Sequence, residues 1–202
     1  MDKVQIIEAR WAGRLLIASG LLTIGLMSQH PEGGHDGLMI PLVHGGLQAV
    51  IVVQLAAMVI GMGRFGWSLW VMAGILFVGA GQLAALGAAT INGFVVPAFF
   101  SHPQGEIGAE IGQFAWEINQ ALARLGVIAT GIGFTLWAVV LWRNARRALA
   151  IAGALAGLVP ALLLASGHIG MNLHGALFVY VTQALWVIAL GWTFARWQPD
   201  AV

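Results

Sequence analysis

The stretch Leu122–Trp142, LARLGVIATGIGFTLWAVVLW, decides the fold class, because it extends for about one membrane thickness with a single charged residue, Arg124. A helix needs about 20 apolar residues to cross the roughly 30 Å hydrocarbon core of a bilayer. The stretch ends at the basic segment Arg143-Asn144-Ala145-Arg146-Arg147, which is too costly to place in hydrocarbon. We therefore predict a transmembrane helix that ends at a membrane surface.

Five further stretches of low charge give a total of six predicted spans. They are approximately Trp11–Ser28, Pro41–Met62, Trp67–Asn92, Ala148–Gly167 and Leu173–Ala195. The composition agrees, because only 8% of the 202 residues are charged, whereas soluble domains carry about 25%. The prediction is an all-α fold, a polytopic membrane helical bundle of six transmembrane helices that forms a single integral membrane domain over residues 1–202.

The distribution of basic residues predicts the orientation of the bundle. Short loops rich in Lys and Arg stay in the cytoplasm. With the N-terminus inside, eight of the nine basic residues fall on the cytoplasmic side and only Arg124 does not. The acidic residues Glu32, Asp36, Glu106, Glu110 and Glu117 fall on the outer side. We therefore predict cytoplasmic N- and C-termini in a plasma (inner) membrane. The basic residues on the predicted cytoplasmic side are Lys3, Arg10, Arg14, Arg64, Arg143, Arg146, Arg147 and Arg196.

Charge and cysteine content exclude several classes of function. A formal net charge of +1 argues against nucleic-acid binding through the phosphate backbone. The absence of cysteine excludes disulfides, thiolate nucleophiles, and zinc or iron–sulfur sites that need thiolates. The chemistry must then come from histidines, carboxylates, amides or a bound cofactor.

All six histidines fall at the outer ends of predicted spans or in outer loops, and imidazole is a common ligand of haem iron and other transition metals. His44, His168 and His174 are the candidate metal ligands. Gly45 and Gly46 would let a flat macrocycle lie against the helix that carries His44. The candidate cofactor-binding residues are therefore His44, His174, Gly45 and Gly46. The alternative is that these histidines donate hydrogen bonds to loop carbonyls at the interface. The full set is His30, His35, His44, His102, His168 and His174.

Two hairpins share a pattern. His44-Gly-Gly-Leu47 and His174-Gly-Ala-Leu177 each begin a span, each with a glycine 17 residues later and a glutamine, Gln54 or Gln183, near the middle of the helix. This suggests a helical-hairpin repeat of residues 11–62 and 148–195, which would bring both histidines to one side of the bundle. Apolar helices also resemble each other by composition alone.

A polar stripe precedes the fourth span. Gln113, Glu117, Gln120 and Arg124 are spaced by four, three and four residues, so they share one helical face. The stripe is either an amphipathic extension at the membrane surface or the polar wall of a cavity below the histidines. Asn92-Gly93, shortly before Pro97, predicts a helix break that would line the same cavity. The candidate catalytic residues are Asn92, Glu117 and Arg124.

Residues 6–142 resemble the membrane-bound styrene oxide isomerase-like haem proteins. The resemblance rests on Glu8-x-Arg10-x-Ala12-Gly13, on His44 with small residues after it, and on Asn92-Gly93. It implies a small helical protein in which His44 ligates haem b, Asn92 lies near the substrate, and the iron acts as a Lewis acid on an epoxide oxygen. The chain departs from this family by two additional C-terminal spans, a shorter first outer loop, and Gln48 where an Asn is expected.

The sequence therefore predicts an integral membrane protein with a histidine-rich haem or transition-metal site at its outer face. The predicted activity is that of a haem-dependent isomerase or redox enzyme acting on small apolar substrates, and copper or zinc are the alternative metals. The alternative functions are a non-enzymatic accessory subunit of a larger membrane complex, or a periplasmic metal-binding or sensing protein. Expected partners are the lipid bilayer, a small apolar substrate, and further copies or subunits, with no nucleic acid.

Overall fold

The computed structural model describes residues 3–30, 38–102, 105 and 107–198, and all regular structure within them is helical. A π-helical turn, Ile91–Val95, joins α3 to α4, and a short 3-10 turn, Gly63–Phe65, follows α2. Glu32, His35, Asp36 and Glu106 lie outside the described residues. The helices are α1 (Lys3–Ser28), α2 (Met39–Met62), α3 (Leu69–Thr90), α4 (Val96–Phe100), α5 (Gly108–Arg143), α6 (Arg147–Ala165) and α7 (Leu173–Ala195).

The six predicted spans are confirmed. Among the described residues, six helical segments are long and apolar enough to cross a membrane, with α3, the π-helical turn and α4 forming one of them. Large apolar side chains cover the outer surface of the bundle, as contact with lipid tails requires. Examples that are more than half exposed are Leu21, Leu76, Leu83, Leu125, Leu162 and Leu185.

The predicted helix break at Asn92-Gly93 is wrong, because the chain stays helical through this point. The N–H of Val96 donates to the carbonyl of Ile91, five residues earlier, so the turn widens instead of opening. Pro97 has no N–H and cannot pair with the carbonyl of Gly93 in the α-helical pattern. A π-helical turn accommodates this defect while keeping the backbone paired, and such turns are frequent at functional sites.

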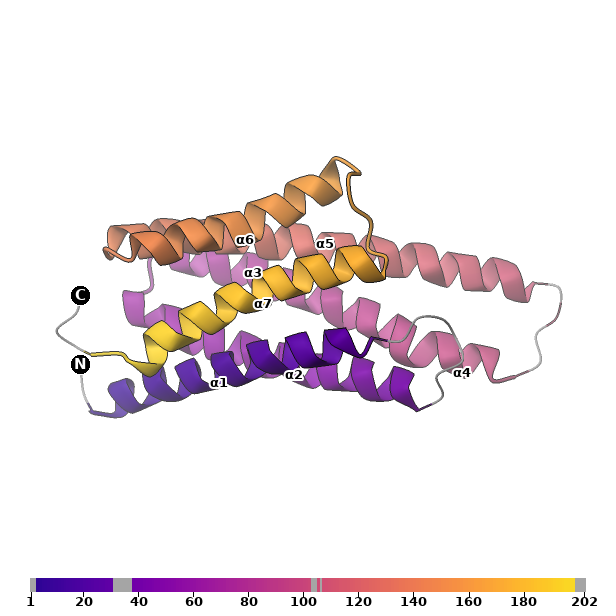
Figure 1. Cartoon of the computed structure of the whole chain (residues 1–202), viewed down its shortest axis with the longest axis horizontal. Helices are drawn as coiled ribbons and strands as arrows, with labels where there is room; N and C mark the ends of the chain where they lie inside the picture. Colours follow the sequence, from indigo (N-terminus) through magenta and orange to yellow (C-terminus); the bar gives the residue numbers. More distant parts are fainter. Residues whose placement is uncertain (1–2, 31–37, 103–104, 106, 199–202) are drawn as a thin grey trace.

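The two ends of the bundle differ in composition. The start of α1 and the end of α7 lie at the same end (Figure 1). We call this the basic end, because the eight Lys and Arg residues of the predicted cytoplasmic side are located there. The opposite, histidine end carries His30, His44, His102, His168 and His174. Four arginines lie over tryptophan rings near the basic end, as expected at a membrane interface. The pairs are Arg14–Trp11, Arg143–Trp70, Arg147–Trp142 and Arg196–Trp192.

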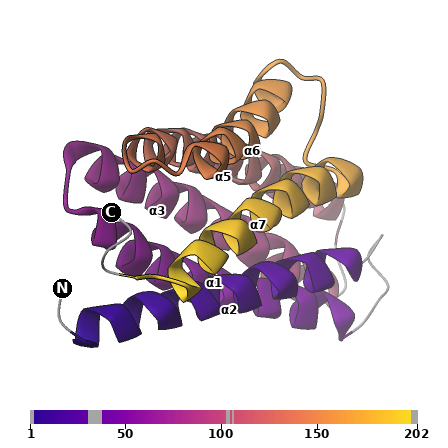
Figure 2. The same ribbon diagram turned by 60° about the vertical axis from the view of Figure 1, so that its left-hand side comes forward.

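Three reciprocal glycine pairs lie in the three most extensive helix–helix contacts. In the α5–α6 pair, a Cβ on Gly131 or on Gly157 would lie 2.5 Å from the other's carbonyl oxygen. In lipid, helices associate by close packing of this kind. The chain thus forms two tightly packed groups, α1–α7 and α3–α5–α6, with α2 against α1 and α3. Figure 2 shows α7 running obliquely between α1 and α6. The glycine pairs are Gly13–Gly191, Gly81–Gly126 and Gly131–Gly157.

Aromatic side chains fill the half of the bundle toward the basic end. The ring centroids of Phe134 and Trp186 are 4.2 Å apart, and the indole N–H groups of Trp137 and Trp186 donate to backbone carbonyls of neighbouring helices. The buried indole Nε1 of Trp197, in the same core, has no hydrogen-bond partner among the described residues. Trp137 donates to Val71 at 3.2 Å, and Trp186 donates to Leu149 at 3.0 Å. The contacts of Trp186 with Phe134 and Leu149 join α7 to α5 and α6, and so join the two groups of helices on this side. The Trp137 bond lies within the α3–α5–α6 group. Toward the histidine end, the inner face of α3 carries alanines, among them Ala85 and Ala88.

Replacing Gly157 by Ala should destabilise the protein, because the new methyl group would collide with the Gly131 backbone. Overpacking of this kind costs about 1–3 kcal/mol. Thermal unfolding in detergent measures the effect. Gly79→Ala is the matched control, since its Cβ would meet nothing within 4 Å. Equal unfolding midpoints for the two variants would contradict the role of this contact.

The predicted orientation can be tested with single cysteines, because the chain has none of its own. Ser166→Cys places a thiol at the histidine end and Ala148→Cys places one at the basic end, both at exposed positions. A membrane-impermeant maleimide added to intact cells should label the Ser166→Cys protein at once. It should label the Ala148→Cys protein only after the cells are permeabilised. The reverse pattern would overturn the assigned topology.

Candidate functional site

A cavity of about 840 Å³ lies between the two groups of helices in the half toward the histidine end. Side chains of α1, α2, α3, α4, α5 and α7 line it, together with the π-helical turn and the loop before α7, whereas no described residue of α6 does. Its volume falls in the range of about 300–1,000 Å³ that is typical of small-molecule and cofactor sites. The cavity is therefore the candidate functional site.

Each wall of the cavity is one face of a helix. The lining residues of α2 are Ile40, His44, Leu47, Ile51 and Gln54, and those of α5 include Asn119, Ala123, Val127 and Thr130. Their spacing of three and four residues places each set on a single face. In both sets two polar side chains, His44 and Gln54 of α2 and Asn119 and Thr130 of α5, are separated by apolar ones. The cavity thus has polar side chains near the histidine end, which we call its outer end, an apolar middle, and further polar side chains at the opposite, inner end.

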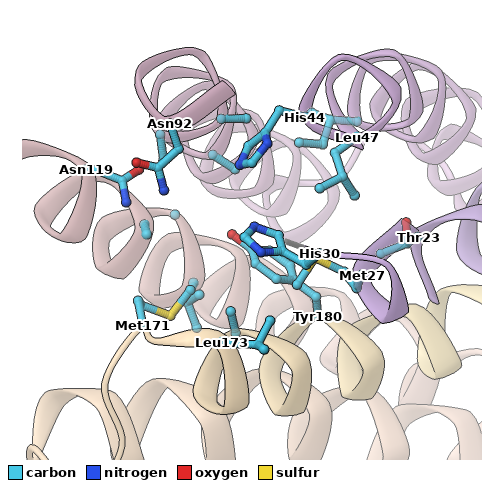
Figure 3. Close-up of a pocket in the computed structure, with 18 of the residues that line it drawn as sticks. Thr23, Met27, His30, His44, Leu47, Asn92, Asn119, Met171, Leu173 and Tyr180 are labelled. Atoms are coloured by element: carbon cyan, nitrogen blue, oxygen red, sulfur yellow. The ribbon is translucent and has the colours of Figure 1, made fainter. Parts of the chain in front are cut away.

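The outer end holds two neighbouring imidazoles. The rings of His30 and His44 are 5.0 Å apart, edge to face. His44 is 5% exposed, and its Nδ1 lies 2.8 Å from the carbonyl oxygen of Ile40. Because a carbonyl can only accept, Nδ1 carries the proton and Nε2 keeps its lone pair. In Figure 3 both imidazoles project into the cavity, with Asn92 and Asn119 on one side and Thr23 and Met27 on the other.

The position of His44 depends on Gly93 in the π-helical turn. A Cβ on Gly93 would overlap the Cβ of His44, so only glycine allows the turn and α2 to approach this closely. One turn further along α2, Gln48 donates to the hydroxyl of Thr90 at 2.7 Å and holds the same two segments together. The sequence pair Asn92-Gly93 therefore has two roles, since Asn92 lines the cavity and Gly93 positions the histidine.

The inner end collects polar side chains from four helices. Gln54 of α2, Gln82 of α3, Thr130 of α5 and Gln183 of α7 all line this part of the cavity, and each is less than a tenth exposed. Nε2 of Gln183 has no hydrogen-bond partner among the described residues. Gln54 follows His44 by ten residues, which corresponds to about 15 Å along α2. The inner end is thus well separated from the imidazoles.

Three of the predicted site residues line the cavity and the others do not. His44, His174 and Asn92 contribute to the lining, although His174 is largely exposed. His168 is exposed in the loop after α6, where its Nδ1 lies 2.8 Å from the hydroxyl of Ser166. Gly45 and Gly46 do not line the cavity. They face Phe94 and Leu26, whose side-chain atoms would lie 3.4 and 3.1 Å from an added Cβ.

The predicted polar stripe of α5 is helical, but it does not line the cavity. Glu117 and Arg124 are exposed, and Gln120 donates to the carbonyl of Met171 at 3.2 Å, which ties α5 to the loop before α7. The adjacent face of α5 lines the cavity through Asn119 and Thr130. Sequence reasoning missed this face. The sequence feature that indicates this face is the pair of small residues, Ala123 and Gly126, that lies between the polar residues Asn119 and Thr130.

Charged groups are absent from the described lining of the cavity. The described residues also contain no group of three or more His, Asp or Glu side chains placed to hold a metal ion. Any metal bound in this part of the protein would depend on imidazole, with His44 Nε2 the nitrogen left open by the geometry. A cofactor that brings most of its own ligands suits such a site better than a bare divalent ion.

In metal-free protein, neutral His44 should carry its proton on Nδ1, because the Ile40 carbonyl can only accept a hydrogen bond. Nitrogen-15 NMR of the ring nitrogens, assigned with a His44→Ala variant, would then show an unprotonated Nε2. His168 is the control, since the Ser166 hydroxyl beside it can donate or accept and imposes no tautomer. A protonated Nε2 on neutral His44 would contradict the described geometry.

The chain has no match among the family models, the curated proteins or the solved structures to which it was compared. Its candidate site is therefore interpreted from its own residues. The resemblance of residues 6–142 to the styrene oxide isomerase-like haem proteins stays a prediction.

Proposed function

We propose that this is a multi-pass plasma-membrane protein that binds haem b in the cavity through Nε2 of His44 and acts on small apolar substrates as an isomerase or oxidoreductase. The observation that carries the proposal is the hydrogen bond from His44 Nδ1–H to the Ile40 carbonyl inside a large cavity. Metal-binding histidines commonly donate their second N–H to a carbonyl, which fixes the ring and makes the ligating nitrogen more basic.

The shape of the cavity supports a flat macrocycle beside His44. The apolar middle is bordered by Ala88, Ala89 and Ala123, which leave room next to the imidazole. No Lys or Arg belongs to the described lining, so the propionate groups would have to pair with uncharged donors such as the amide N–H of Asn172. In this arrangement the alanines, and not Gly45 and Gly46, would lie against the macrocycle, because both glycines face other side chains.

The protein's own residues would bind the substrate and exclude water from it. Five transmembrane segments surround the cavity, and most of its lining is apolar, so transfer of an apolar substrate from water into the cavity is favourable. Exclusion of water prevents hydrolysis of a reactive substrate. Asn92 and the buried Asn119 can orient a substrate oxygen near the outer end. When bound, haem supplies a Lewis-acidic or redox-active iron.

Purified protein is expected to show a Soret band and to contain iron, and His44→Ala should remove both, because the open nitrogen is lost. Absorption spectra and elemental analysis measure this. His168→Ala is the matched control, since His168 is exposed outside the cavity lining and its loss should leave the spectrum unchanged. Colourless, iron-free protein that retains its activity would refute the proposal, and an unchanged spectrum for His44→Ala would move the ligand elsewhere.

A second candidate is a copper or zinc site formed by His30 and His44. The 5.0 Å separation of their ring centroids favours it. Imidazole suits both metals. Elemental analysis separates the candidates, because this site predicts bound copper or zinc without a Soret band.

A further inference from the structure

The polar inner end of the cavity is not needed to hold a cofactor at His44, yet four helices direct side chains to it. We call Gln54, Gln82, Thr130 and Gln183 the inner subsite. Their exposed fractions are 7%, 8%, 3% and 8%. Phe134, whose ring packs on Trp186, closes the cavity beneath them. Polar residues within transmembrane helices are uncommon and generally face a functional cavity.

The inner subsite has unused hydrogen-bonding capacity. Gln183 has a buried Nε2 without a partner among the described residues. An unsatisfied buried amide costs free energy, and replacing it with a well-packed apolar group would remove that cost. The terminal torsion of a glutamine is soft, so its N–H can turn toward an oxygen atom in the cavity. A ligand that accepts a hydrogen bond would satisfy this group.

We infer that the inner subsite binds the oxygen atom of an uncharged, apolar ligand, such as a ketone or quinone, through the amide N–H groups of Gln183 and its neighbouring glutamines. The ligand is uncharged because no charged side chain is available in the described lining to pair with it. Its body is apolar because Ile51, Ala85 and Val187 surround the amides.

The separation of about 15 Å along α2 between His44 and Gln54 makes this subsite distinct from the iron-binding position. The inference rests on the proposed function only in that the cavity is a ligand site, and it needs no haem. A His44→Ala variant separates the two. If the His44→Ala protein loses the Soret band and still binds a ligand at the inner subsite, the haem proposal and the subsite inference both stand. If wild-type protein contains no haem but binds that ligand, only the haem proposal fails.

The experiment compares menadione, an uncharged quinone, with methylnaphthalene, a similar ring system without oxygen. Protein in lipid nanodiscs is titrated with each, and empty nanodiscs correct for partition into lipid. Menadione should bind more tightly, and Gln183→Leu should weaken its binding about tenfold while leaving methylnaphthalene unchanged. Gln48→Leu is the matched control, because Gln48 lies on α2 outside the cavity lining and bonds Thr90 instead.

Two further measurements do not depend on affinity. The carbonyl stretching frequency of bound menadione should fall relative to menadione in lipid, and Gln183→Leu should reverse part of that shift. The same variant should unfold at a higher temperature than wild type in the absence of ligand, because it removes an unsatisfied buried amide. Equal affinity of wild-type protein for menadione and methylnaphthalene, or an unshifted carbonyl frequency, would overturn the inference.

Discussion

Close approach of helix backbones at glycine is the constraint on which the rest of this structure depends. Lipid tails are as apolar as leucine, so burial of apolar surface does not hold transmembrane helices together. The contact must come from packing, and the three reciprocal glycine pairs supply it in the three most extensive helix contacts. None of these pairs joins α1 or α7 to α3, α5 or α6, so the closest helix packing occurs within two groups.

The cavity follows from how these two groups meet. Toward the basic end, Phe134 and Trp186 span the space between α5 and α7, and the bundle is filled. Toward the histidine end, alanines of α3 and α5, among them Ala88 and Ala123, border a hollow of about 840 Å³. Side-chain size on these two helices thus contributes to placing the cavity in this half. The Gly93 contact then brings His44 to the outer part of that hollow.

Sequence periodicity identified sets of residues that share a helical face, but not which face turns inward. The spacing of Gln113, Glu117, Gln120 and Arg124 does place them together, yet the adjacent face, through Asn119, lines the cavity. Likewise, Gly45 and Gly46 are small enough to border a cofactor, and they face Phe94 and Leu26 instead. The rotation of each helix depends on packing with its neighbours, which a single helix does not encode.

The sequence by itself determined the six helices, because each needs only its own apolar length, and the polarity of the bundle, because basic residues and histidines segregate along the chain. Three of its candidate residues, His44, Asn92 and His174, line the cavity. Only the tertiary structure decided that Gln54, Gln82 and Gln183 meet, since they are far apart in sequence and lie on three helices. The physical reason is that helix formation is local, whereas the cavity exists only where different helices pack around a shared space.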